Sequence, residues 1–286
     1  MRKNIYDEPK IDCHNHVFDP VRFPYRANTI YRPSAQEVGT VQQFTRVMDA
    51  YGVRHALLVG PTSGYRTDNR YLLEALATGE GRFKGIAVVD DDIDIRELAA
   101  LKEQGVVGVA FNPANEGLGV MSGVHRLFGQ LAELDLFAQI QVQQDQLVEL
   151  TDLLDRSRAR LLIDHCGRPS ALDGVGQPGF KRLLTLADSG RASVKLSGMQ
   201  KFGNMDTLYE DTQVYVQALL SAFGAHACVW GSDWPFLREQ ARVDYGPLLK
   251  LAERFMPDPD VRRQVMWETP VKLFGFPQIN GGATPP

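Results

Sequence analysis

The stretch KIDCHNHVF, residues 10–18, is the first of eight short apolar runs that alternate with helical patterns and so decide the fold. The other seven runs end in polar or glycine-containing turns and cover 55–60, 83–90, 106–112, 136–142, 160–166, 192–198 and 227–233. Strands that alternate with helices pair in parallel through right-handed crossovers. Because most of the runs are continuously apolar, the sequence predicts a parallel sheet that is buried on both faces.

Helical periods occupy the intervals between the runs, and several begin after Asp or Ser or end in Gly, as helices should. They cover 41–52, 68–79, 94–105, 122–135, 145–158, 180–190, 208–224, 243–255 and 260–275. Eight near-regular units with no GxGxxG after the first strand favour a closed α/β fold, the (β/α)8 TIM barrel, over an open doubly wound sheet. We expect one barrel domain over residues 1–276 and a poorly ordered tail over residues 277–286.

The composition disfavours several classes of function. The 286 residues are 44% apolar and 23% charged, which is typical of a globular protein. A net charge of −4 does not indicate the basic surface that nucleic-acid binding requires, and no apolar run is long enough to span a membrane. The N-terminal MRKNIYDEPK lacks the apolar core of a signal peptide. We expect a cytoplasmic protein that binds a small molecule and neither nucleic acid nor a membrane; the sequence does not indicate its oligomeric state.

Polar residues stand at the ends of three predicted strands, where (β/α)8 barrels carry their functional residues. The first run ends with His14 and His16, the sixth with His165 and the eighth with Asp233. Since alternate residues of a strand share a face, Asp12 is expected to point the same way as the two histidines of the first run. Further polar residues are expected at the same mouth: Asp164, Ser232, Lys195, Ser197, Gln139, Gln141, Gln143, Tyr65, Arg66, Asp68 and Asn69. The remaining histidines are expected to be structural: His55, His125 and His226.

This pattern of HxH on the first strand, His on the sixth and Asp on the eighth resembles the amidohydrolase superfamily. More closely, the chain is similar to the branch that contains 2-pyrone-4,6-dicarboxylate lactonase and related sugar lactonases. The matching stretches are, in chain order, DCHNHVFD, GYRTDN, GIAVVD, LLIDHCGRP, VKLSG, WGSDWP and TPVKLFGF. The resemblance implies a barrel enzyme that hydrolyses a small anionic lactone, which is a carboxylic ester hydrolase activity.

For such a reaction the four strand-end residues have natural roles. Asp233, with an ordinary pKa of about 3.9, would be ionised at neutral pH and would accept the proton of the attacking water. His14, His16 and His165 would each present an N–H to the lactone carbonyl oxygen. General-base help of this type is worth roughly 10²–10⁴-fold in rate, and one well-aimed donor about 3–4 kcal/mol.

Two further aspartates are candidates for holding these imidazoles. Asp12 or Asp164 would accept a hydrogen bond from the ring nitrogen that faces away from the substrate. Asp12 has an alternative role, which is to pair with Lys195 inside the barrel.

The same four residues, His14, His16, His165 and Asp233, are also ligand types for one divalent metal. Many amidohydrolases take a further His from strand 5, and binuclear members take a bridging Lys or Glu from strand 4. This chain offers glutamines on the fifth run and VAFNPAN at the fourth, and amides are poor zinc ligands. Because some members of the resembled branch work without metal, we expect no required cofactor, with a single zinc or manganese ion as the alternative.

An anionic substrate calls for Arg or Lys at the site. The predicted substrate-binding residues are Arg66, Tyr65, Asn69, Gln141, Arg168, Ser197 and Lys201. Arg238 is expected to be a solvated loop charge. The chain departs from the pyrone lactonase pattern at Ala110 and at Gln200–Lys201, where that pattern has arginines, and at Phe236, where it has His. We therefore expect the chemistry to be retained and the specificity to differ.

Other functions stay open at this point: a metal-dependent decarboxylase of the same superfamily, a sugar-acid lactonase and a lactone isomerase. A non-catalytic barrel is disfavoured, because it would have no reason to gather three histidines and an aspartate at one mouth. The segment VRFPYRANTIYRP, residues 21–33, is either a lid whose Arg22, Arg26 and Arg32 cover an anion or an irregular crossover with surface charges.

Overall fold

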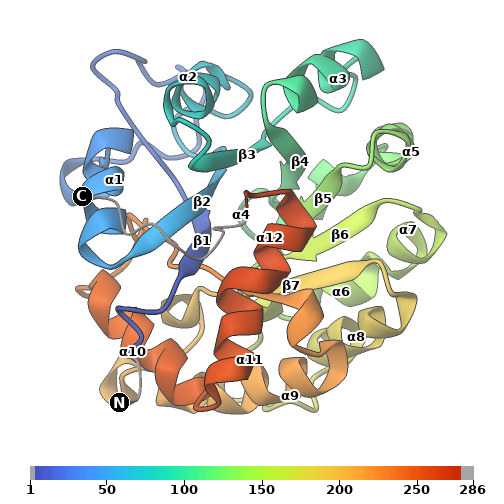
Figure 1. The fold of residues 1–286 in the computed structure, drawn as a ribbon. Coiled ribbons are helices and arrows are strands. Elements are labelled where there is room, and N and C mark those ends of the chain that lie inside the picture. Colours follow the sequence, from blue (N-terminus) through green and yellow to red (C-terminus); the bar gives the residue numbers. More distant parts are fainter. Residues whose placement is uncertain (1–3, 278–286) are drawn as a thin grey trace.

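Eight parallel strands form one sheet in which each strand lies beside the next in the chain, from β1 to β8 (Figure 1). The computed structural model describes residues 4–277. The strands are β1 Lys10–Asn15, β2 Val53–Val59, β3 Phe83–Ala87, β4 Val106–Phe111, β5 Phe137–Ile140, β6 Arg160–Ile163, β7 Ala192–Leu196 and β8 Cys228–Trp230. The two ends of the sheet also meet, since Asn15 forms a parallel bridge with Trp234 and the amide of Asp233 donates to the carbonyl of His14 at 2.8 Å. The predicted (β/α)8 barrel is confirmed.

Helices cover the outside of the barrel (Figure 1). They are α1 Val41–Ala50, α2 Arg70–Thr78, α3 Ile95–Glu103, α4 Pro113–Glu116, α5 His125–Glu133, α6 Gln146–Glu149, α7 Thr151–Arg156, α8 Pro178–Thr185, α9 Gln213–Phe223, α10 Tyr245–Phe255, α11 Pro259–Arg263 and α12 Thr269–Phe274. Several start as the sequence predicts, with Thr40 and Asp94 capping α1 and α3 through their side chains. The longer helices bury the apolar stripe from which they were predicted, as α1 does with Val41, Phe44 and Met48.

Some predicted elements are shorter or broken in the structure. The helix expected over 145–158 divides into α6 and α7, and the one expected over 260–275 contains a π-helical stretch, Gln264–Glu268. The runs expected to extend to 166 and 233 leave the sheet at Ile163 and Trp230. Their last residues adopt positive φ, which no strand tolerates. His165 and Asp233 therefore lie on turns that follow the strands, whereas His14 lies within β1.

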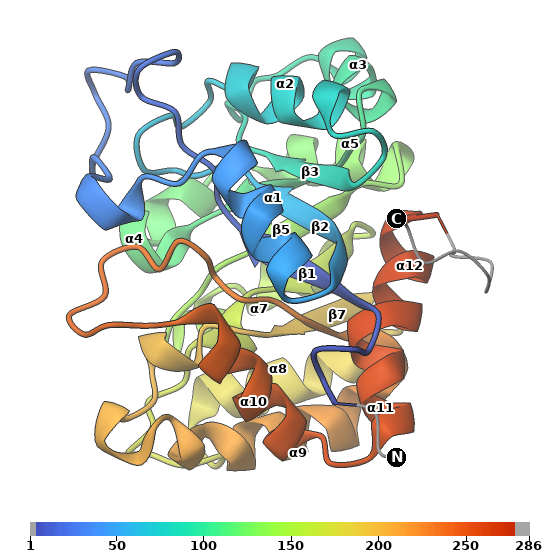
Figure 2. The same ribbon diagram turned by 60° about the vertical axis from the view of Figure 1, so that its left-hand side comes forward.

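The two ends of the barrel differ. At one end Trp267, Val271, Phe274 and Phe276 pack against apolar side chains of the barrel interior, and α12 lies across this end (Figure 1). At the other end the long β1–α1 and β8–α10 connections project, on the left in Figure 2. This open end is the carboxyl end of the strands, where the site is expected. The predicted tail over 277–286 lies outside the described residues except for Pro277.

β1 does not alternate regularly. Its pairing with β2 shifts register between Asp12 and Asn15, and Cys13 packs with Ile11 in the barrel interior. The carboxylate of Asp12 instead accepts from the hydroxyl of Tyr245 on α10 at 2.9 Å, on the side of the helix layer. Asp12 therefore does not share the face of the two histidines, and the regular alternation predicted for this strand is wrong. A bulge of this kind re-aims side chains next to active sites.

Candidate active site

The turns that follow β6 and β8 hold several residues in the left-handed region. φ is 52° at His165, 54° at Cys166, 44° at Arg168 and 65° at Asp233. Each non-glycine residue in this region costs roughly 1–2 kcal/mol. Strain of this kind persists only where the surrounding structure enforces it, and it clusters at functional sites. The backbone outliers thus coincide with the residues predicted to do the chemistry.

Three imidazole nitrogens face one carboxylate oxygen. Nε2 of His14, His165 and His16 lie 3.7, 3.8 and 4.0 Å from Oδ1 of Asp233. His14 and His165 are 1% exposed, and the side chain of His16 is 12% exposed. The barrel therefore brings together the four residues predicted to be catalytic.

Burial makes these imidazoles neutral at neutral pH. It lowers the pKa of His14 well below the usual range, and the nearby charge of Lys195 lowers it further. Burial likewise lowers the pKa of His165 well below its usual range. The pKa of His16 is also lowered by burial, against an opposing effect of Asp233. Each ring therefore carries a single N–H, and its neighbours decide on which nitrogen.

His16 has its proton on the nitrogen that faces away from Asp233. Its Nδ1 lies 2.8 Å from the carbonyl oxygen of Val59 on β2. A carbonyl oxygen can only accept, so Nδ1 donates and Nε2 keeps a free lone pair. The prediction that all three imidazoles present an N–H to the substrate is therefore wrong for neutral His16, whose Nε2 can only accept.

His165 lies over strand β7. Its Nδ1 is 3.0 Å from the hydroxyl of Ser197, a buried residue that was predicted to touch substrate but instead holds this ring. Gly198, with φ of 66°, follows directly under the imidazole. A Cβ at that position would lie 2.5 Å from Cγ and 2.7 Å from Cβ of His165. The ring can occupy its place only because residue 198 has no side chain.

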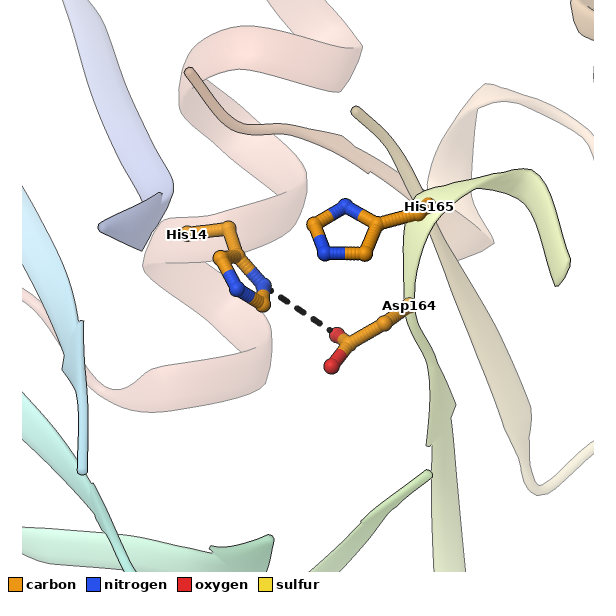
Figure 3. A group of neighbouring side chains, drawn as sticks. All are labelled: His14, Asp164 and His165. Carbon is orange, nitrogen blue, oxygen red and sulfur yellow. Dashed lines mark ion pairs between the residues drawn. The ribbon is translucent and has the colours of Figure 1, made fainter. Parts of the chain in front are cut away.

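His14 stands on a buried polar network contributed by three other strands or strand ends. Its Nδ1 lies 3.1 Å from Nζ of Lys195 and 3.3 Å from Oδ1 of Asp164; Figure 3 shows the contact with Asp164. Lys195 also donates to Oε1 of Gln139 at 2.6 Å, and Gln139 donates to Oδ2 of Asp164 at 2.9 Å. Lys195 pairs with Asp164 at 3.2 Å, not with Asp12 as one alternative predicted.

Asp12 has a structural role. Its Oδ1 accepts from the amides of Ser232 and His14 at 2.9 and 3.2 Å, and its Oδ2 accepts from the hydroxyls of Ser232 and Tyr245. Burial raises the pKa of Asp12, and these hydrogen bonds oppose the rise. The carboxylate ties β1 to the turn after β8, which carries Asp233, and it does not contact an imidazole ring as predicted.

Asp233 is held as an ionised base. Its Oδ2 accepts from Nε2 of Gln200 at 2.9 Å and lies 3.4 Å from Nζ of Lys201. Burial alone would raise the pKa of Asp233, but the charge of Lys201 and its hydrogen bond to the carboxylate act in the opposite direction, and the pKa lies below the usual aspartate range. Lys201 is itself paired with Glu239 at 2.5 Å and donates to the carbonyl of Leu237 at 2.6 Å. Its charge is therefore already compensated.

A cavity of about 430 Å³ opens above these residues, which is a suitable size for a small ligand. Its wall on the side of β2, β4 and β5 is neutral and polar, with Thr62, Asn112 and Gln141. The opposite wall is charged and carries Arg168, Lys201, Arg238 and Glu239. Of the predicted substrate-binding residues, Gln141, Arg168 and Lys201 line this cavity.

Arg168 is a half-buried charge of the cavity that forms no ion pair within the described chain. Its Nε is buried without a hydrogen-bond partner, and within residues 4–277 its guanidinium has no carboxylate within 4.0 Å. Burial lowers its pKa, and the more distant Asp233 and Glu239 oppose this effect. A half-buried guanidinium without a partner is suited to receiving a planar anion.

The residues predicted from the loop after β2 lie outside the cavity. Tyr65 is buried among aromatic rings, and its hydroxyl accepts from the amide of Asp19. Arg66 pairs with Glu116 at 2.9 Å. The amide of Asn69 bonds both the N–H and the carbonyl of Val88. All three side chains have structural partners, so none is free to reach a substrate in this arrangement.

The segment 21–33 does not cover the cavity, since no residue from it is among those lining the cavity of the described chain. Arg22 forms a bidentate pair with Glu74 at 2.7 Å, and Arg26 donates to Thr67. Arg238, expected to be a solvated charge, is exposed but lines the cavity and lies over the ring of Tyr31 at 4.3 Å. The segment is therefore better described as an irregular crossover with surface charges than as a lid over the cavity.

Four other residues belong to the network around the predicted site: Gln139, Lys195, Gln200 and Glu239. Gln139 and Lys195 were expected at this mouth from their places on the fifth and seventh runs, but without a predicted catalytic or substrate-binding role. Gln200 and Glu239 follow strands at distances that no periodicity fixes, so only the fold reveals them.

The donor set fits one divalent ion in its types and spacing. His14, His16 and Asp233 have ligand atoms within 4.8 Å of one another. When bound there, zinc or manganese would polarise a carbonyl oxygen. A ligating imidazole needs a bare nitrogen, and His16 offers one. His14 does not meet this requirement, because the ammonium of Lys195 lies 3.1 Å from its Nδ1 and leaves the ring proton on Nε2; the set therefore matches a metal in ligand types and spacing but not in protonation.

A (β/α)8 barrel with HxH after β1, His after β6 and Asp after β8 around one polar cavity defines an enzyme scaffold of the amidohydrolase class. The sequence model of the family described as Amidohydrolase matches residues 11–276, and the chain belongs to this family. The resemblance inferred from the motifs is confirmed. Among residues 4–277, the helices are too short or too polar to cross a bilayer.

Two curated relatives and one solved structure are similar over most of their length. The 4-sulfomuconolactone hydrolase of Rhizobium radiobacter is 32% identical over 272 residues, 92% of this chain and 89% of the relative. The 2-pyrone-4,6-dicarboxylate hydrolase of Comamonas testosteroni is 24% identical and covers the same shares of both chains. A structure from Pseudomonas putida, of a protein proposed to be a 2-pyrone-4,6-dicarboxylic acid hydrolase, has a TM-score of 0.82 at 30% identity and covers 93% of this chain and 97% of its own.

Proposed function

We propose that this protein hydrolyses a small anionic lactone. The observation that carries the proposal is the convergence of three neutral imidazoles on Oδ1 of an ionised, buried Asp233. This arrangement offers a base for water and hydrogen-bond donors for a carbonyl oxygen at one point. The relatives support it, because those named above act on lactones that carry acidic groups, as their names state.

The reaction begins with water held between Asp233 and the bare Nε2 of His16. Asp233 takes a proton from this water while the water oxygen forms a bond to the lactone carbonyl carbon. The carbonyl oxygen becomes an oxyanion, which His14 and His165 stabilise through Nε2–H. A well-aimed donor in a dry site is worth about 3–4 kcal/mol. The ring C–O bond then breaks, and the leaving oxygen receives the proton from Asp233, which yields an open-chain acid and restores the carboxylate.

Arg168 binds the anionic group of the substrate. Arg168 is the more buried of the two cavity guanidiniums that form no ion pair within residues 4–277, whereas Lys201 is held between Asp233 and Glu239. Arg238 stands at the rim and suits a second anion. The opposite wall has Ala110 and neutral amides, so that side of the ring meets hydrogen-bonding groups without charge.

The test is hydrolysis of two lactones, 4-sulfomuconolactone and 2-pyrone-4,6-dicarboxylate, by chelator-treated protein, followed by ultraviolet absorbance. D233N is the control because it keeps the shape of the side chain and removes the base. We expect turnover of at least one lactone after chelation and a loss of roughly 10²–10⁴-fold in D233N. Turnover of neither lactone, with or without added zinc, would contradict this substrate class and favour uncharged sugar lactones.

A further inference from the structure

We propose that Lys195 is a positioning residue that fixes His14 as an Nε2–H donor and thereby keeps His14 from binding a metal. The proposal deepens the proposed function, on which its catalytic part rests. The whole of it concerns one buried contact, between Nζ of Lys195 and Nδ1 of His14 at 3.1 Å.

The chemistry of the two groups assigns the direction of this hydrogen bond. A lysine ammonium has three N–H donors and no acceptor. Lys195 is 0% exposed, and its Nζ has three partners: Oε1 of Gln139 at 2.6 Å, Nδ1 of His14 at 3.1 Å and Oδ1 of Asp164 at 3.2 Å. The first two are hydrogen bonds and the third is an ion pair, and in all of them an ammonium can only donate. Nδ1 of His14 must be the bare nitrogen, and the ring proton is then on Nε2, which faces Asp233.

Asp164 is the competing partner, because its Oδ1 lies 3.3 Å from the same Nδ1. If Nδ1 donated to Asp164, its proton would face an N–H of Lys195. The geometry also disfavours that bond, since Oδ1 of Asp164 receives no well-directed hydrogen bond from any residue of the described chain, 4–277. Asp164 thus balances the charge of Lys195 without setting the tautomer of His14.

The two histidines of the HxH pair consequently have opposite tautomers. Val59 accepts from Nδ1 of His16 and leaves its Nε2 bare, whereas Lys195 donates to Nδ1 of His14 and leaves its Nε2 protonated. A metal binds the bare nitrogen of an imidazole. His16 can be a ligand in this state and His14 cannot, so the pair is arranged to hold a water on one side and polarise a carbonyl on the other.

The first experiment reads the tautomer directly, by long-range ¹H–¹⁵N correlation spectra of protein labelled at its six histidines. The signal of His14 is assigned by its absence in H14Q. We expect Nε2–H in the wild type and in D164N, and Nδ1–H in K195M, where Asp164 becomes the remaining partner. If K195M does not fold, the double variant K195M/D164N replaces it in this measurement, because it leaves no unpaired buried charge. In the double variant His14 should no longer have one fixed tautomer. An Nδ1–H tautomer in the wild type, or a change in D164N without one in K195M, would overturn the proposal.

The second experiment is calorimetric titration with Zn²⁺ alone. We expect H14Q to bind zinc as the wild type does, since His14 is not a ligand, and K195M to bind it more tightly through the freed Nε2. A loss of zinc affinity of about 10–100-fold in H14Q, the size typical of a disrupted metal site, would overturn the proposal. Both readouts are independent of turnover, so they stand if the proposed lactone is wrong.

The kinetic test needs a lactone that the protein hydrolyses. With such a lactone, K195M should lower kcat and leave KM nearly unchanged. A change in KM as large as the change in kcat would contradict the positioning role.

Discussion

The close approach of Gly198 to His165 gives a sharp test of how the site is built. Gly198→Ala places a methyl group within 3 Å of Nδ1, Cγ and Cβ of His165, at a backbone φ of 66°. Because the clash involves the root of the imidazole side chain, rotation of the ring cannot relieve it. The left-handed backbone costs an alanine roughly 1–2 kcal/mol, and overpacking of a tight site adds about 1–3 kcal/mol. The expected loss of stability is thus about 2–5 kcal/mol, with displacement of His165.

Gly190 provides a matched control for this substitution. Its φ of 65° is nearly the same, but an added Cβ there has no atom within 4 Å. Gly190→Ala should lose only the backbone part, about 1–2 kcal/mol, and keep full kcat/KM. Urea denaturation and lactone hydrolysis measure both effects. Equal stability and equal activity of the two variants would refute the claim that a missing side chain at 198 is what allows His165 to face Asp233.

Three further predictions follow from charges and hydrogen bonds of the site. Lys201→Met removes the cation that lowers the pKa of Asp233, so the base becomes protonated at higher pH and the acid limb of the kcat/KM profile should move upward; an unmoved limb contradicts the assignment of Asp233 as the base. Arg168→Met should raise KM for an anionic lactone by about 10–100-fold. Arg158→Met, at an exposed arginine outside the cavity, is the control and should leave KM unchanged. An unchanged KM in Arg168→Met would show that the anion binds elsewhere. Tyr245→Phe removes a buried hydrogen-bond donor to the carboxylate of Asp12, which joins β1 to the turn after β8. It should lower the free energy of unfolding by about 1–3 kcal/mol, and an unchanged midpoint of urea denaturation would contradict this.

Sequence reasoning predicted the fold and the meeting of the candidate catalytic residues for the same physical reason. In a parallel barrel every strand ends at the same mouth, so polar residues at the ends of the first, sixth and eighth runs must meet whatever the loops do. Nε2 of His14 and Nε2 of His165 accordingly lie within 4 Å of Oδ1 of Asp233. The pattern of strands and helices fixes this meeting point without any knowledge of individual contacts.

Loop residues and charge pairs were not predictable in this way. Arg66 was expected to bind an anion, but Glu116 from the β4 side neutralises it, and no local pattern reveals a partner so distant in the sequence. Lys201 lines the cavity, yet Glu239 takes up its charge. A sequence shows which face or loop holds a charge, whereas the pairing of charges depends on tertiary distances of 3–4 Å.

The HxH motif shows where this limit lies. His14 and His16 are the same residue type, two positions apart on one strand, and the motif alone assigns them the same role. The structure gives them different neighbours: a lysine ammonium from β7, which can only donate, and a carbonyl from β2, which can only accept. Because a neutral imidazole has one proton, these neighbours make one Nε2 a donor and the other an acceptor. Under the proposed tautomers, the residues behind the two histidines decide whether each imidazole would bind a metal or polarise a carbonyl, and Lys195 is that residue for His14.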